Sequence, residues 1–213
     1  MAYVLGYFAA DGCMIENKRG AHFIEFVSTD KILVDQVQRV VMSNHSISLR
    51  ERGKNAKTAF RLQIGSKEWF NDLTELGFTT SKSNTLHFPS VPPRFLGDFV
   101  RGYFDGDGCV YFKEHWSKWH RKNVWVLTTR FTSGSKAFLA GLHNELRDRG
   151  LSGGYYNLKK KGAYDLVFSR RDSLALYRLM YNTAEVPDLF LPRKREKLER
   201  AIQVLGLDTK VRS

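Results

Sequence analysis

The sequence predicts an α+β fold built from two similar repeats, each with the order helix, hairpin, helix, hairpin, helix (αββαββα). A Gly-Tyr-Phe-x-x-Asp-Gly motif occurs twice, at residues 6–12 and 102–108. The same order of helical and strand patterns follows each copy. Between the copies, three of the five prolines mark a linker at residues 79–93. We therefore predict a first repeat at residues 1–78 and a second, pseudo-symmetric repeat at residues 94–213.

Each motif is predicted to lie on a helix that packs against its counterpart. Two small residues four apart share one face of each helix, namely Gly6 with Ala10 and Gly102 with Gly106. Close packing through these faces would bring Asp11 and Asp107 together at the C-terminal ends, each before a glycine that ends the helix. Two neighbouring carboxylates repel each other. A shared proton or a hard divalent cation relieves that repulsion.

The rest of the first repeat follows from alternation and helix caps. Strands are expected at residues 13–18, 22–27, 46–52 and 58–64. Ser28-Thr-Asp30 supplies the N-cap of one helix, and Ser66 caps another that runs to residue 76.

The second repeat shows the same order with a longer first loop. Strands are expected at residues 109–112, 124–131, 155–160 and 164–168, and a last helix at about 193–205. Ser135 and Asp172 are the expected caps of the two intervening helices. Residues 113–123 are expected to form a basic loop that contains Trp116 and Trp119.

Simpler interpretations of these residues explain less. A calcium loop that opens at Asp105 requires a closing Glu, and Trp116 stands at that position. Ordinary helix packing with locally satisfied aspartates explains one motif and leaves its duplication unexplained. His115 and His120 lie in a polar segment without Cys-x-x-Cys, so no zinc site is expected.

Composition indicates an intracellular protein with a polyanionic partner. The 213 residues are 42% hydrophobic, enough for a substantial core, and carry a net charge of +12. Lys and Arg neutralise phosphates and release counterions, although a basic protein without such a partner stays open. Cys13 and Cys109 follow the two motifs at the same position, which favours equivalent strand positions over a disulfide. No apolar run approaches the length of a membrane span.

Alternation along the strands gives each predicted sheet an apolar face and a basic, amide-rich face. Leu62 and Ile64 point one way, while Arg61 and Gln63 point the other. A basic strand face suits the major groove, where Arg reads guanine, Gln reads adenine and Lys neutralises phosphates. A solvated strand face is the alternative for any single residue. The candidate DNA-binding residues are Asn17, Arg19, Glu25, Arg50, Arg52, Lys54, Arg61, Gln63, Tyr111, Lys113, Thr128, Arg130, Asn157, Lys159, Lys161 and Asp165.

Both motifs resemble that of the LAGLIDADG homing endonucleases. The second copy is closer, since it ends Asp105-Gly-Asp-Gly108, whereas the first has Ala9 where the family often has an acid. In motif and element order the resemblance covers nearly the whole chain. It implies a monomer whose two antiparallel sheets form a saddle over duplex DNA.

By motif position, the resemblance implies metal binding by Asp11 and Asp107 with the backbone carbonyls of Ala10 and Gly106. Mg2+ is the expected cation, Mn2+ an expected substitute, and Ca2+ is expected to support binding without cleavage. Such an ion would contact a scissile phosphate, activate a water and stabilise the leaving 3′ oxygen. One site for each strand would give a double-strand break.

The family also often has an assisting lysine after the last helix of a repeat, and Lys82 stands at a similar place. A surface lysine is the alternative. The second repeat has no clear match near residues 181–186, from which we hypothesise unequal cutting of the two strands.

The implied function is a site-specific, divalent-metal-dependent DNA endonuclease that cleaves a long target site, as in intron homing. Its partner would be double-stranded DNA, with no small-molecule substrate. The expected location is the cytoplasm or nucleoid of a prokaryote, or an organelle matrix. The alternatives are a catalytically silent DNA-binding regulator or intron RNA maturase with the same fold, and the endonuclease domain of an intein.

Overall fold

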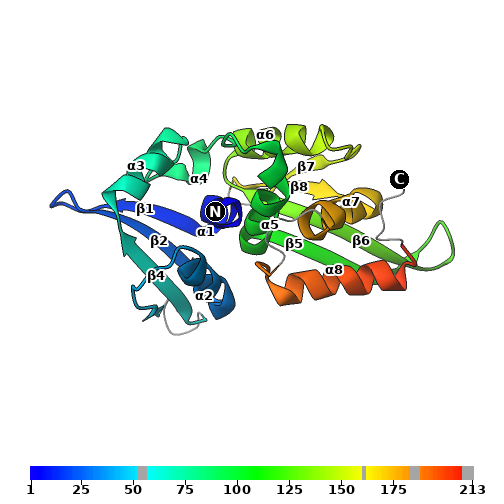
Figure 1. The fold of residues 1–213 in the computed structure, drawn as a ribbon. Coiled ribbons are helices and arrows are strands. Elements are labelled where there is room, and N and C mark those ends of the chain that lie inside the picture. The colour runs from blue at the N-terminus through cyan, green and yellow to red at the C-terminus, as the bar shows by residue number, and fades with distance from the viewer. Residues whose placement is uncertain (52–56, 160–161, 183–187, 208–213) are drawn as a thin grey trace.

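The computed structural model describes residues 1–51, 57–159, 162–182 and 188–207. Two four-stranded sheets flank a central helix pair (Figure 1). The first repeat contains α1 (Ala2–Asp11), β1 (Gly12–Glu16), β2 (His22–Ser28), α2 (Lys31–Val40), β3 (Ser48–Arg50), β4 (Ala59–Gly65) and α3 (Lys67–Glu75). After α4 (Lys82–Thr85) and the 3-10 turn η1 (Pro93–Phe95), the second contains α5 (Leu96–Asp107), β5 (Gly108–Ser117), β6 (Lys122–Ser133), α6 (Lys136–Arg147), β7 (Tyr155–Leu158), β8 (Tyr164–Phe168), α7 (Arg170–Tyr181) and α8 (Pro192–Val204). The α+β prediction with two αββαββα repeats is confirmed.

The two sheets have the same topology. Their strand orders are β1-β2-β4-β3 and β5-β6-β8-β7, and every pair is antiparallel. Cys13 and Cys109 occupy the second position of the first strand in each sheet, as predicted, and they form no disulfide with each other. The division of the chain at residues 79–93 stays a prediction.

Alternation buries one face of each sheet under its helices. Phe26 and Leu62 in the first sheet, and Phe131 and Leu166 in the second, are fully buried partners in the strand ladders. One continuous apolar core joins both repeats. In the part of the chain that the structure describes, no helix has the length and apolar character that crossing a bilayer requires.

The central helices α1 and α5 approach until their backbones touch, as the small residues predict. A Cβ on Gly6 would lie 2.0 Å from the Phe99 carbonyl oxygen, and one on Gly102 would lie 2.0 Å from the Tyr3 carbonyl oxygen. The two contacts are reciprocal. No side chain larger than hydrogen fits at either glycine without moving the helices apart.

The β5–β6 hairpin is longer than the sequence predicted. Residues 113–117 and 122–123, expected in a loop, continue the ladder, so that Lys113 pairs with Val126 and Trp116 with Asn123. Backbone pairing does not require apolar side chains. The polar composition of this segment therefore gave no sign that both predicted strands continue toward the tip of the hairpin. Trp116 and Trp119 are exposed at its tip.

The predicted cap at Asp172 was wrong. Helix α7 has Ser169 as its N-cap, and Asp172 lies inside the first turn, where its carboxylate accepts hydrogen bonds from the backbone N–H groups of Ser152 and Gly153. The caps at Ser66 and Ser135 are confirmed, because each hydroxyl accepts from the third residue of its helix.

Residues 189–194, which we call the clasp, join the C-terminal segment to both repeats. Its carbonyl at Leu189 accepts from Arg101 Nε at 2.6 Å, and its carbonyl at Phe190 accepts from Gln36 Nε2 at 3.0 Å. The Leu191 N–H donates to Asp105 Oδ2 at 2.9 Å. Because Gln36 belongs to the first repeat, the clasp crosses the boundary between the repeats.

The Asp105 carboxyl lies buried beneath the clasp. Its Oδ2 also accepts from the Tyr3 hydroxyl at 2.8 Å, while Oδ1 has no hydrogen-bond partner within the described residues. Burial raises the pKa of Asp105 from 3.8 to about 6. The folded chain therefore binds this proton more tightly than the unfolded chain does.

Substituting Gly6→Ala should destabilise the fold by about 1–3 kcal/mol or more, because the added methyl overlaps the Phe99 carbonyl. Urea unfolding measures this change. Gly65→Ala is the matched control, since its Cβ would meet Phe23 at an ordinary 3.6 Å. Equal midpoints for the two variants would contradict the account of the helix interface.

Stability should also depend on the Asp105 proton. The protonated carboxyl stabilises the fold below about pH 4, and this stabilisation is lost as the pH rises through about 6. The free energy of unfolding of the wild type should therefore fall relative to Asp105→Asn over that interval. Urea titrations across this range test it, with the exposed Asp72→Asn as control. A constant difference between wild type and Asp105→Asn would refute the assigned pKa.

Candidate active site and nucleic-acid interface

The two motif acids lie at the adjoining C-terminal ends of α1 and α5. Asp11 is exposed and Asp107 is half-buried. A Cβ on Gly106 would lie 2.5 Å from Ala10 Cβ and 3.2 Å from Asp11 Oδ2, so the Asp11 carboxylate reaches the last turn of the opposite helix. The predicted juxtaposition of the two motif ends is thus present at the centre of the molecule.

The glycines after the acids serve a different purpose from the one expected. Gly12 and Gly108 have extended backbones, with φ of −78° and −82°, and not the left-handed conformation of a typical helix-ending glycine. An added Cβ would lie 2.0 Å from the Phe8 ring at Gly12 and 2.2 Å from the Phe104 ring at Gly108. Lack of space therefore requires glycine at both positions.

Lys194 from α8 lies buried against the end of α5. Its Nζ donates to the carbonyls of Phe104 at 2.6 Å, Asp105 at 2.7 Å and Gly106 at 3.1 Å. A cation at a helix C-terminus complements the carbonyls that have no helical partner. Burial lowers the pKa of this ammonium to about 8, and the nearby carboxylates oppose that shift.

A small polar hollow of about 170 Å³ opens beside Asp11 and Gly106. Its other wall includes Asp30 and Arg193, which form a two-armed ion pair at 2.7 and 3.1 Å. Hydrogen bonding from Arg193 lowers the pKa of Asp30. This contact links α8 to the start of α2, so residues from both repeats enclose the space next to the motif acids.

The donor atoms at the motif ends fit a hard cation. Among the described residues no group of three or more His, Cys, Asp or Glu side chains is arranged for a metal, so an ion here would depend on carboxylates, carbonyls and substrate oxygens. Asp11, Asp107, and the Ala10 and Gly106 carbonyls offer only oxygen, which Mg2+ prefers. Gly106 shares its carbonyl with Lys194.

The predicted DNA-binding residues of the first sheet lie together on its open face. The strand pairs Glu25–Gln63 and Val27–Arg61 place them on the face opposite the buried ladder. Glu25 is buried there, and its carboxylate accepts from Arg61 Nε at 2.5 Å and Arg50 Nη1 at 3.1 Å.

The second sheet presents a similar face. Tyr111 pairs with Thr128, and Asn157 with Asp165, on the side away from the helices. Asp165 is buried and accepts from the Thr132 hydroxyl at 2.6 Å. Two basic side chains approach its carboxylate less closely, Lys159 at 3.6 Å and Arg130 at 3.8 Å.

The other predicted residues are placed less centrally. Asn17 and Arg19 are exposed at the β1–β2 turn, where Asn17 Oδ1 accepts two backbone N–H groups and so shapes the turn. Lys113 is exposed on the extended hairpin. Arg52, Lys54, Lys161 and the Lys82 side chain lie outside the described residues.

Sequence reasoning missed Arg193 and Lys194. The available signal was the run Arg193-Lys194-Arg195 directly after Pro192 at a helix start, where acidic residues are favoured and basic ones are not. Such a run indicates that another negative group lies nearby. Lys194 lies outside residues 181–186, where a matching lysine was sought, and unequal cutting of the two strands stays a prediction.

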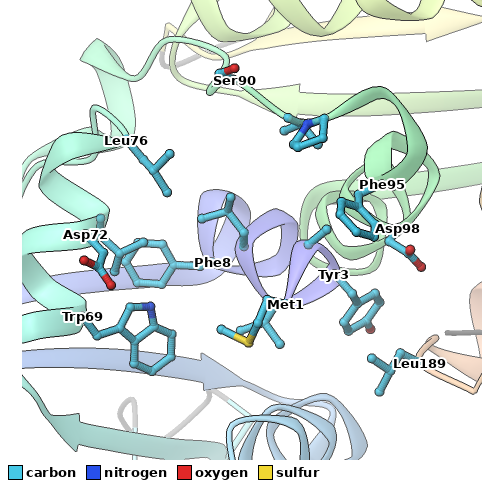
Figure 2. A pocket seen from close by; sticks show the side chains of 16 residues that line it. Met1, Tyr3, Phe8, Trp69, Asp72, Leu76, Ser90, Phe95, Asp98 and Leu189 are labelled. Atoms are coloured by element: carbon cyan, nitrogen blue, oxygen red, sulfur yellow. The ribbon is translucent and has the colours of Figure 1, made fainter. Parts of the chain in front are cut away.

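A large apolar cavity lies at the opposite end of α1 from Asp11. It has a volume of about 440 Å³ and is lined by Tyr3 and Phe8 from α1, by Trp69 from α3 and by Leu76, which follows α3 (Figure 2). No convergent set of catalytic groups lines it. The motif acids, and not this cavity, are the candidate active site.

Comparisons with known proteins agree with this geometry. Residues 1–76 match the family model described as a LAGLIDADG-like domain. Comparison with curated protein sequences gives no match.

Solved structures match over nearly the whole chain. The homing endonuclease I-WcaI bound to its DNA recognition sequence has a TM-score of 0.63 at 16% identity, over 92% of this chain and 84% of that one. The I-LtrWI LAGLIDADG homing endonuclease bound to target DNA has a TM-score of 0.60 at 12% identity, over 96% and 90%. The I-SmaMI LAGLIDADG homing endonuclease bound to cleaved DNA has a TM-score of 0.61 at 12% identity, over 96% and 89%. The first repeat of this chain therefore belongs to the LAGLIDADG-like family, and the whole chain has the fold of the LAGLIDADG homing endonucleases.

Proposed function

We propose that this chain is a site-specific DNA endonuclease that uses divalent metal ions to make a double-strand break in a long target. The observation that carries the proposal is the meeting of two acid-bearing helix ends between two sheets. The Asp11 carboxylate lies against Gly106 in the last turn of α5, and Gly106 directly precedes Asp107. Each helix end serves one strand of the duplex.

The sheets supply the partner surface for double-stranded DNA. Their open faces carry Arg50, Arg61, Arg130 and Lys159, and the chain as a whole has a charge of +12. Basic strand faces suit the major groove, and their charge attracts phosphates from any sequence. Structures of the same fold hold target DNA in I-LtrWI and I-WcaI.

Residues of this chain have distinct roles in the proposed reaction. Asp11 and Asp107, with the Ala10 and Gly106 carbonyls, would hold Mg2+, which when bound polarises the scissile phosphate and activates water. Lys194 fixes the last turn of α5 through three carbonyl contacts, and in the proposed reaction its positive charge would act on the nearby phosphate. Positioned charge of this kind stabilises the charge that develops during hydrolysis.

Cleavage of a randomised duplex library tests the proposal. With Mg2+ the chain should cut at one long site. Double-strand cutting should be lost with EDTA, with Ca2+ in place of Mg2+, and in Asp11→Asn and Asp107→Asn with Mg2+ present, because each change removes the productive ion or one of its ligands. Tight duplex binding without cutting under any metal would instead identify a DNA-binding regulator or an RNA maturase.

Lys194→Met should lower the cleavage rate by at least about tenfold while duplex binding in Ca2+ stays nearly unchanged, because the charge acts at the reacting phosphate and not on the sheet faces. Lys197→Met, on an exposed position of the same helix, is the control and should cut at the wild-type rate. Strand-specific labels report which strand slows. Parallel losses of binding and cleavage in Lys194→Met would assign this lysine to structure alone.

A further inference from the structure

The open faces of the two sheets carry the same charges in exchanged positions. Register defines the equivalences. Glu25 in the first sheet and Arg130 in the second each pair with the cysteine of the first strand. Arg61 and Asp165 are likewise equivalent, since each pairs with the residue two positions after Glu25 or Arg130.

A third position completes each group. Arg50 pairs with Ala59 in the first sheet. In the second, the Lys159 N–H donates to the Ala163 carbonyl at 2.7 Å and continues the β7–β8 ladder, so Lys159 is the counterpart of Arg50. Each group of three therefore holds one acidic and two basic side chains, with the acid on β2 in one sheet and on β8 in the other.

Both acids are buried while their basic partners remain accessible. The Glu25 side chain is 6% exposed, beside 54% for Arg50 and 33% for Arg61. The Asp165 side chain is also 6% exposed, beside 41% for Arg130 and 44% for Lys159. A buried carboxylate that already accepts hydrogen bonds within the protein is poorly placed to contact the edge of a nucleobase. It acts instead on the charge and orientation of the arginine and lysine side chains around it.

The two acids hold their partners differently. Glu25 bonds Arg61 through Nε, which leaves both terminal nitrogens of that guanidinium for a ligand. A fixed, planar pair of donors is what two-armed contact with guanine requires. Asp165 instead accepts its shortest hydrogen bond from the Thr132 hydroxyl, and the nearest nitrogens of Arg130 and Lys159 lie 3.6 Å or more from its carboxylate.

We infer that Glu25 and Asp165 are positioning residues that set DNA sequence discrimination. Each carboxylate cancels one positive charge that would attract a duplex of any sequence. Each also orients the arginine and lysine side chains beside it. The close ion pairs of Glu25 make the first half-site the stricter one. The inference rests on the DNA binding proposed above.

The test measures discrimination and not only affinity. In the presence of Ca2+, a randomised duplex library is mixed separately with the wild type, with Glu25→Gln and with Asp165→Asn. The duplexes that each protein binds are then sequenced. Glu25→Gln should lose about tenfold in discrimination at a few adjacent base pairs of one half-site. Asp165→Asn should affect the other half-site, and more weakly. On a fixed arbitrary duplex, each variant should bind with a log–log salt slope steeper by about one.

An exchange variant separates charge from geometry. Glu25→Arg combined with Arg61→Glu copies the arrangement of the second sheet and keeps the net charge. Its affinity for the arbitrary duplex should return to the wild-type value, while its base preference stays changed. If Glu25→Gln does not fold, as judged by urea unfolding, Arg61→Lys must produce the same local loss, because it keeps the charge and loses the planar donors.

The outcomes distinguish this inference from the proposed function. Wild type that binds no duplex would overturn both. Wild type that selects a site, with Glu25→Gln or its substitute Arg61→Lys selecting that site equally well, would overturn the inference alone. Equal loss of discrimination across both half-sites would also overturn it, since a local positioning role changes one half only.

Discussion

The backbone contact between α1 and α5 is the constraint on which the rest of the structure depends. The Phe99 and Tyr3 carbonyls occupy the space that a side chain at Gly6 and at Gly102 would fill, and the two contacts are reciprocal. The two helices therefore pack about a pseudo-two-fold axis that relates the two repeats. Because Asp11 and Asp107 end these helices, and the first strand of each sheet begins at the next residue, the axis fixes acids and sheets together. Moving the two helices apart would separate the acids and tilt the open faces of both sheets at once.

The parts of the fold that local sequence determines were predictable. Small residues four apart gave the helix pair, alternation gave both open faces, and hydroxyl caps placed α3 and α6. The clasp was not predictable, because its contacts join residues far apart in the chain, such as Asp105 with Leu191 or Lys194 with Gly106. The ends of the long hairpin were missed for a different reason. Backbone pairing holds its polar residues in strands, and polarity alone gives no sign of this.

The clasp makes the symmetric fold asymmetric. The second motif has Arg101 and Asp105 where the first has Leu5 and Ala9, and these two polar residues bind the clasp. Burying them is unfavourable in isolation, as the raised pKa of Asp105 shows. Lys194 offsets part of this cost, because its ammonium is buried nearby and its attraction for the carboxylate opposes the effect of desolvation on both groups. The clasp thus makes hydrogen bonds to side chains of the second motif helix that have no polar equivalent at the same positions of the first.

On the proposed function, attraction to DNA alone would not explain the carboxylates on the open faces of the two sheets. Glu25 and Asp165 each remove a positive charge from a face that would bind phosphates more strongly without them. Because each group holds one acidic and two basic side chains, the two groups would attract a duplex to a similar degree. The directions of their hydrogen-bond donors differ, since the acid stands on different strands. On the proposed function, attraction and recognition would therefore be set by separate features, and a nearly symmetric scaffold would read two unlike half-sites.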